Sequence, residues 1–242
     1  MKIAIPARLN STRLNSKPLI KVFGLSILER TYRQCEKAIN SKDIIVLTDS
    51  LEIESFCKAK LMNVIIVDNE CKTGTDRIAL YASLKKINYI INVQGDEPLI
   101  DPKDIRIVIE EAKKNSNVIL NGYKKITNKN DFNNRAIPKV VFDKHKNLMY
   151  MSRSPIPGNK NGNFVSGFKQ VCIYGFPKSA IDFIIKNPRK SFLENIEDIE
   201  VLRFVESGLK VKMIELFGNS FSIDTKSDLK KLKRYLKINE SS

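Results

Sequence analysis

Residues 2–6 read KIAIP, a short, mostly apolar run rich in β-branched side chains that is typical of a buried strand. Three more runs of this kind follow at residues 43–48 (DIIVLT), 63–67 (NVIIV) and 89–94 (YIINVQ). Amphipathic segments separate the four runs at residues 26–39, 50–60 and 73–86. Apolar strands that alternate with helices are typical of a doubly wound parallel sheet with right-handed crossovers. We therefore expect an α/β fold with a mostly parallel, Rossmann-like sheet.

The pattern becomes mixed after Asp101. Helices are expected at residues 102–114, 178–186, 193–207 and 225–238. Strands are expected at residues 117–123, 139–143, 148–152, 170–176 and 210–216, with loops at 128–134 and 155–167. Since the sequence contains no clear linker or internal repeat, residues 1–242 are interpreted as a single domain with an inserted mixed region at about residues 120–190.

Composition narrows the function classes. The chain has 242 residues, a formal net charge of +15 and four scattered cysteines, Cys35, Cys57, Cys71 and Cys172. A metal cluster, a disulfide framework, a membrane span and a signal peptide are all not expected, which favours the cytoplasm. Because lysines are spread over the whole chain, the charge favours an enzyme with anionic substrates over a nucleic-acid-binding protein.

The loop after the first strand is rich in cations and hydroxyls. Residues 7–17 read ARLNSTRLNSK and contain Arg8, Ser11, Arg13 and Lys17. Ligands of open α/β sheets bind at strand ends, where turning amides and fixed cations can hold a polyphosphate. The alternative is a solvated basic loop, and the residues alone leave both readings open.

Acidic residues follow the fourth strand in NVQGDEP, residues 92–98. Asp96 and Glu97 are expected to face the same edge of the sheet as the basic loop, which indicates a magnesium site beside a phosphate site. A capped turn between Gly95 and Pro98 is the alternative.

Two further acidic segments allow a structural or a functional role. Asp224 in FSIDT precedes the last predicted helix and is either part of a helix N-cap, which Asp224 or Thr225 could supply, or a second magnesium ligand. In LENIEDIEVLR, residues 193–203, the glutamates either favour the helix dipole or bind sugar hydroxyls, and Glu200 could form a surface pair with Arg203. His145, the only histidine, lies in a lysine-rich turn and is not expected to be catalytic.

Taken together, the motifs resemble the 3-deoxy-manno-octulosonate (KDO) cytidylyltransferase family from about residue 2 to 235. The resemblance is carried by IPARLNSTRL-x-x-KPL, TGTDRI, NVQGDEP, YMSRSPIP, IYGF, LENIEDIEVLR and IDT. It implies a nucleotide-diphosphosugar transferase-like three-layer sandwich, Mg²⁺ as cofactor, and a homodimer whose inserted region carries sugar and possible dimer contacts. The substrates implied are CTP and an acidic eight- or nine-carbon sugar, with no nucleic acid or membrane partner.

The resemblance also implies roles by position. Catalytic roles fall to Arg8, Arg13, Lys17, Asp96 and Asp224, of which Asp96 and Asp224 would hold the metal. CTP would be bound by Pro6, Ala7, Arg8, Ser11, Arg13, Lys17, Thr73, Gly74, Thr75 and Arg77. The sugar would be bound by Gln94, Arg153, Gln170, Tyr174, Glu194 and Glu197.

Departures from the family pattern fall mainly in the sugar half. Gln170 stands where relatives often have histidine, and NNRAIPK before Lys139 replaces a Pro-Asn-x-Val-Lys pattern. In the basic loop, Asn15 and Ser16 replace a Pro-Gly turn but leave the cations in place. The sequence therefore indicates CTP as nucleotide and KDO as sugar, with 8-amino-KDO or a nonulosonic acid as alternatives and a non-enzymatic nucleotide- or nucleic-acid-binding module as a remote one.

Overall fold

The computed structural model describes residues 1–9, 14–67 and 71–239, and the chain divides into two compact units. The first unit comprises Met1–Tyr81, Asn92–Arg106 and Gly218–Ser242, and the second comprises Ala82–Ile91 and Ile107–Phe217. The chain passes between the units within strand β6 (Tyr89–Val93), helix α3 (Gly74–Leu84) and helix α4 (Pro102–Lys114), and again after Phe217. The expected insertion lies inside the second unit, and the single-domain hypothesis stays a prediction.

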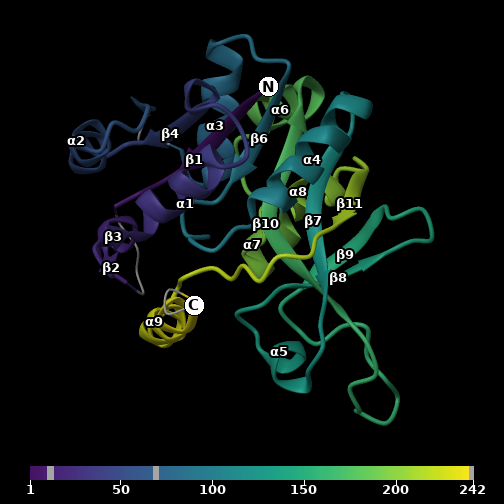
Figure 1. Ribbon diagram of the computed structural model, residues 1–242. Coiled ribbons are helices and arrows are strands. Elements are labelled where there is room, and N and C mark those ends of the chain that lie inside the picture. The colour runs from purple at the N-terminus through teal and green to yellow at the C-terminus, as the bar shows by residue number, and fades with distance from the viewer. Residues whose placement is uncertain (10–13, 68–70, 240–242) are drawn as a thin grey trace. The chain divides into compact units, whose positions relative to one another are not determined.

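The first unit contains the predicted parallel strands (Figure 1). Its strand order is β6-β1-β4-β5, with β1 at Lys2–Pro6, β4 at Ile44–Thr48 and β5 at Val64–Ile66. Helices α1 (Ile27–Glu36) and α2 (Leu51–Ala59) connect these strands. Each begins after a serine, Ser26 or Ser50, whose side chain accepts a hydrogen bond from the backbone amide three residues later. The predicted alternation of strands and helices is confirmed in this half.

Helix α9 (Lys226–Asn239) packs its apolar face into a cluster of the first unit. The buried members of this cluster are Leu14, Val22, Ile27, Ile223, Leu232 and Leu236. Val22 comes from a small antiparallel pair, β2 (Lys21–Val22) and β3 (Leu25–Ser26), which is too short to be visible as a sequence pattern. The cluster therefore joins the segments on both sides of the basic loop to the segment that contains Ile223.

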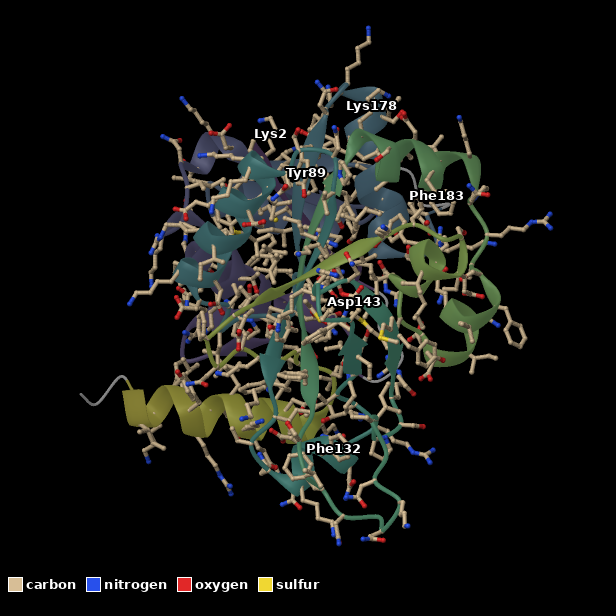
Figure 2. The ribbon with its side chains drawn as sticks, turned by 90° about the vertical axis from the view of Figure 1, so that its right-hand side faces the viewer. Lys2, Tyr89, Phe132, Asp143, Lys178 and Phe183 are labelled. Carbon is tan, nitrogen blue, oxygen red and sulfur yellow. The ribbon has the colours of Figure 1, made fainter. Side chains whose placement is uncertain are left out.

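The second unit contains a mixed sheet with strand order β11-β7-β10-β6. Its strands are β7 (Ile119–Lys125), β8 (Lys139–Phe142), β9 (Leu148–Ser152), β10 (Phe168–Pro177) and β11 (Val211–Glu215). β7 is parallel to β11 but antiparallel to β10, and β8 pairs antiparallel with both β9 and β10. Helix α6 (Lys178–Lys186) follows β10 with the predicted bounds. The predicted hairpin is confirmed, and its turn is held by the carboxylate of Asp143, labelled in Figure 2.

Two predictions for the second unit are wrong. The expected loop at 128–134 contains the short helix α5 (Lys129–Asn133), in which Phe132 is buried (Figure 2). The expected helix at 193–207 is two helices, α7 (Phe192–Glu197) and α8 (Leu202–Glu206). Asp198 ends α7 because its backbone is left-handed, with φ of 51°.

A buried ion pair joins α7 to α8. Arg203 donates from Nε to Oε2 of Glu194 at 2.6 Å and from its second terminal nitrogen to Oε1 at 2.7 Å. The side chains of Arg203 and Glu194 are only 2% and 0% exposed. The predicted surface location of Arg203 is therefore wrong, since this guanidinium neutralises a carboxylate inside the second unit.

The cysteines and the helices agree with the composition. All four cysteines are free thiols, and burial raises the pKa of Cys57 to about 12. Within the described residues, no helix combines the length and the apolar character that a membrane span requires.

We predict that Glu194→Gln lowers the free energy of unfolding by about 3–5 kcal/mol, because it leaves the Arg203 charge buried without its partner. Asp182→Asn is the matched control. It breaks the exposed pair between Asp182 and Lys178 of α6, which is worth about 0–1 kcal/mol. Urea denaturation of both variants measures the difference, and equal losses would show that the buried pair has no special weight.

Candidate functional site

Lys17 lies between two carboxylates from distant parts of the chain. Its Nζ is 2.6 Å from Oδ2 of Asp96 and 3.0 Å from Oδ1 of Asp224. The side chains of Lys17, Asp96 and Asp224 are 13%, 26% and 22% exposed, so solvent and ligands can still reach them. The structure thus brings together three of the five residues expected to be catalytic.

The backbone holds the two carboxylates beside each other. Asp96 follows β6, and its carbonyl accepts a hydrogen bond of 3.0 Å from the amide of Ile223, the residue before Asp224. Lys17 begins the 3-10 helix η1 (Lys17–Leu19), which is anchored by the buried Pro18. The segments that carry the two acids are therefore tied directly to each other, while the lysine reaches them on a long side chain.

Thr225, and not Asp224, caps the last helix. The hydroxyl of Thr225 accepts from the amide of Asp228 at 3.2 Å, and the carboxylate of Asp228 accepts from the amide of Thr225 at 2.8 Å. This reciprocal arrangement satisfies the start of α9. The side chain of Asp224 is consequently available for the contact with Lys17.

Glu97 has a different surrounding from its neighbour Asp96. Its side chain is buried and accepts a hydrogen bond from the hydroxyl of Ser220. The expectation that both acids face the ligand edge is wrong for Glu97, since the two side chains leave the turn in different directions.

The charges of the cluster are partly balanced. Burial lowers the pKa of Lys17, but attraction to Asp96 and Asp224 and the hydrogen bonds to them raise it by more, so this pKa lies above its usual value. Lys17 therefore stays cationic at neutral pH. One cation between two carboxylates leaves a net negative charge, which a further cation can compensate.

The donor set formed by Asp96 and Asp224 fits a divalent cation. Mg²⁺ takes carboxylate oxygens and usually keeps several waters, so two converging carboxylates and bound phosphates suffice. Among the side chains that the structure describes, no group of three or more His, Cys, Asp or Glu residues could hold a metal ion. Water or phosphate oxygens would have to complete the coordination.

The basic loop is only partly described. Arg8 is exposed just after β1, whereas Pro6 and Ala7 are buried at the end of the strand. Ser11 and Arg13 lie outside the described residues, so their predicted contacts with a triphosphate stay predictions.

The start of α3 packs against the ends of β1 and β6. A Cβ added to Gly74 would lie 3.1 Å from Cγ of Pro6 and 3.5 Å from Nε2 of Gln94. Thr73 and Asp76 cap the helix reciprocally, with hydrogen bonds of 2.9 and 3.1 Å between amide and side chain. Three residues expected to contact nucleotide or sugar therefore meet at one edge of the sheet. Thr75, in the first turn of α3, is 4% exposed.

Arg77 holds the edge of the sheet together. It is buried, and its guanidinium donates to the carbonyl of Ala7 at 3.2 Å and to the carboxylate of Asp49. A direct role on the base or ribose is thus joined by a structural one. Asp49 was missed by the sequence analysis, although an acid placed just after the strand at 43–48 follows the same pattern as Asp96 after β6.

In the second unit, Arg153 and Glu197 lie together. The amide of Arg153 donates to Oε2 of Glu197 at 2.8 Å, and the guanidinium donates to the carbonyls of Arg135, Glu197 and Asp198. The other oxygen of Glu197 accepts from the hydroxyl of Ser152 at 2.6 Å. These contacts hold the SRSPIP segment against the end of α7.

Gln170 and Tyr174 also lie together, across an irregularity in β10. The amide nitrogen of Gln170 donates to Oδ1 of Asn121 at 3.1 Å and to the hydroxyl of Tyr174 at 3.2 Å. Glu194 differs from the other predicted sugar residues, because its carboxylate is fully buried on Arg203. Direct contact between Glu194 and a sugar is therefore not supported, and its place is structural.

Lys139 is a further residue that the sequence analysis did not single out. It is fully buried and donates to the carbonyls of Asn134, Ile137 and Arg153 at 2.7 to 2.9 Å. Burial, reinforced by the charge of Arg153, lowers the pKa of Lys139 to about 8. A lysine within the apolar run KVVF was the available signal, since charged side chains are buried only where they find partners.

Comparison with known proteins places this site in a family. A family model described as cytidylyltransferase matches residues 3–214. A 3-deoxy-manno-octulosonate cytidylyltransferase of Fusobacterium nucleatum is 37% identical over 240 residues, which are 97% of this chain and 96% of the relative. One from Rickettsia prowazekii is 36% identical over 240 residues, with 97% and 94% covered. The chain belongs to the 3-deoxy-manno-octulosonate cytidylyltransferase family.

Solved structures support the same fold. A CMP:2-keto-3-deoxy-manno-octonic acid synthetase complexed with CTP has a TM-score of 0.86 at 26% identity, with 98% of both chains covered. A cytidylyltransferase of Leptospira borgpetersenii has a TM-score of 0.66 at 17% identity over 98% of this chain and 86% of its own. The second likeness concerns the fold alone. The predicted α/β class with a mostly parallel sheet is confirmed.

We predict that Gly95→Ala disturbs the site, because the added Cβ would lie 2.8 Å from the carbonyl oxygen of Pro6. Overpacking of this kind costs about 1–3 kcal/mol of unfolding free energy. Gly158→Ala is the control, since a Cβ there has no described atom within 4 Å. Thermal denaturation should show a lower midpoint for Gly95→Ala only, and identical midpoints would contradict the close packing.

Proposed function

We propose that this chain transfers the CMP group of CTP to 3-deoxy-D-manno-octulosonate and releases pyrophosphate. The convergence of Lys17, Asp96 and Asp224 in a member of this family is the observation that carries the proposal. A cation beside two carboxylates at strand ends is the arrangement that a triphosphate with a divalent metal requires.

The nucleotide is held by the first unit. The cations Arg8, Arg13 and Lys17 and the hydroxyl of Ser11 bind the triphosphate as it leaves β1. The cytosine and ribose end is bound by Pro6, Ala7, Thr73, Gly74, Thr75 and Arg77. The packing of Gly74 on Pro6 and the bond from Arg77 to the carbonyl of Ala7 support this assignment, because they join the start of α3 to the end of β1.

The reaction is a direct nucleotidyl transfer. The anomeric hydroxyl of the sugar attacks the α-phosphorus, a new phosphorus–oxygen bond forms, the bond to pyrophosphate breaks, and the hydroxyl proton is lost to a base. Arg8, Arg13 and Lys17 stabilise the charge that grows on the phosphoryl oxygens and the leaving pyrophosphate. Mg²⁺ held by Asp96 and Asp224 would supply Lewis-acid stabilisation of the same charge.

The sugar acid is bound by Gln94 of the first unit and by residues of the second. Arg153, Gln170, Tyr174 and Glu197 supply a cation, two neutral polar groups and an acceptor, which suit a polyhydroxylated carboxylate. Their mutual hydrogen bonds support a preorganised arrangement. Gln170, which replaces a more usual histidine, is the residue that leaves 8-amino-KDO or a nonulosonic acid as alternatives.

The setting follows from the product. A CMP-activated KDO serves lipopolysaccharide or capsule synthesis, and CTP is a cytoplasmic nucleotide, so we assign the enzyme to the cytoplasm. A homodimer is the assembly suggested by the family resemblance. Neither nucleic acid nor membrane is a partner in this proposal.

We expect Asp96→Asn to lower turnover roughly 100-fold or more, as loss of one charge-stabilising group in an active site does, while part of the CTP affinity remains. Asp182→Asn, which removes a carboxylate from the exposed pair on α6, is the control and should keep normal turnover. Pyrophosphate release with CTP, Mg²⁺ and KDO is the assay. Near-normal release by Asp96→Asn would exclude the proposed metal role.

A substrate panel tests the sugar assignment. KDO should give the highest kcat/KM among KDO, 8-amino-KDO and a nonulosonic acid when pyrophosphate is assayed with CTP. A higher value for another sugar would replace KDO by that sugar. Salt-sensitive binding to random oligonucleotides without any turnover would instead favour the binding module.

A further inference from the structure

We propose that Lys17 occupies the cation position of the site before nucleotide arrives, so that Mg²⁺ can bridge Asp96 and Asp224 only after a triphosphate has drawn the lysine away. The proposal deepens the proposed function, because it assigns an order to the binding of metal and CTP. It rests on the two bonds of 2.6 and 3.0 Å that join one ammonium to both acids.

The two carboxylates need a cation at all times. The bond between the amide of Ile223 and the carbonyl of Asp96 ties their segments together, and both side chains are about three-quarters shielded from solvent. Like charges held so close repel each other unless a cation lies between them. The Lys17 ammonium fulfils this need, which is why its attraction to Asp96 and Asp224 outweighs the effect of its burial.

An ammonium and a magnesium ion cannot share this position. Mg²⁺ requires oxygen ligands at about 2.0–2.1 Å, inside the distances at which Nζ now contacts both acids. A bare metal must therefore break both ion pairs of Lys17 before it can bridge the carboxylates.

A triphosphate lowers this cost by giving Lys17 new partners. Pro18 anchors the backbone of η1, but the four-carbon stem of the lysine leaves its ammonium free to turn toward phosphate oxygens. Each ligand then makes the binding of the other more favourable, and this coupling is reciprocal. In the absence of nucleotide, Lys17 acts as an internal competitor of the metal.

Metal affinity without nucleotide tests the proposal. Mn²⁺ binding to the full-length chain is titrated by electron paramagnetic resonance for wild type, Lys17→Met and Lys17→Gln. Removing the competitor should tighten Mn²⁺ binding at least roughly tenfold in both variants, since charge-assisted hydrogen bonds no longer have to break. Lys21→Met removes the same charge from an exposed position on β2 and should change the affinity less than about twofold, as a solvent-screened charge does.

The second site variant shows where the metal binds. Asp96→Asn in the Lys17→Met background should abolish the gain in affinity. An unchanged or weaker Mn²⁺ affinity of folded Lys17→Met and Lys17→Gln, with folding checked by circular dichroism, overturns the competition. If Asp96→Asn alone still removes turnover in that case, the proposed function survives while this inference fails.

Discussion

Two carboxylates that must lie side by side form the constraint on which the site depends. Asp96 comes from the middle of the chain and Asp224 from near its end, and a single backbone hydrogen bond holds their segments together. Lys17 makes this arrangement tolerable by placing a positive charge between them. The affinity for phosphate and the affinity for a divalent cation are thus two uses of one electrostatic imbalance, since the cluster is one charge short of neutrality.

Apolar packing sets this electrostatic device in position. Leu14 lies three residues before Lys17, and Ile223 lies one residue before Asp224, yet both belong to the same buried cluster with Leu232 and Leu236 of α9. Helix α9 therefore contributes to the site without supplying a ligand of its own. Hydrophobic burial, which is not directional, brings the segments together, and hydrogen bonds then select the geometry.

Regular structure was predictable where periodicity was strong. The runs at 2–6, 43–48, 63–67 and 89–94 became strands because continuous apolar runs have few other ways to be buried. The division of 193–207 into two helices was not predictable, because it depends on the left-handed backbone of Asp198, which no periodicity reveals.

The site was predictable in its members more than in their contacts. Position after a strand pointed to Asp96, but the same reasoning could not tell that Glu97 would turn to Ser220. Arg203 was assigned to the nearest acid in sequence, Glu200, whereas folding gave it Glu194 as a buried partner nine residues away. Such choices depend on which side chains tertiary packing buries, and spacing along the chain carries little information about that.

The division of the chain into two units has a consequence for the order in which the protein matures. The first unit is built from Met1–Tyr81, Asn92–Arg106 and Gly218–Ser242, so its last portion leaves the ribosome after all residues of the second unit. Chains tend to fold from the N-terminus during synthesis, as far as the necessary segments are present. The second unit can therefore assemble first, while Asp96 waits for Asp224. A nascent chain stalled before its final segment would lack the paired acids, which delays catalytic competence until translation is nearly finished.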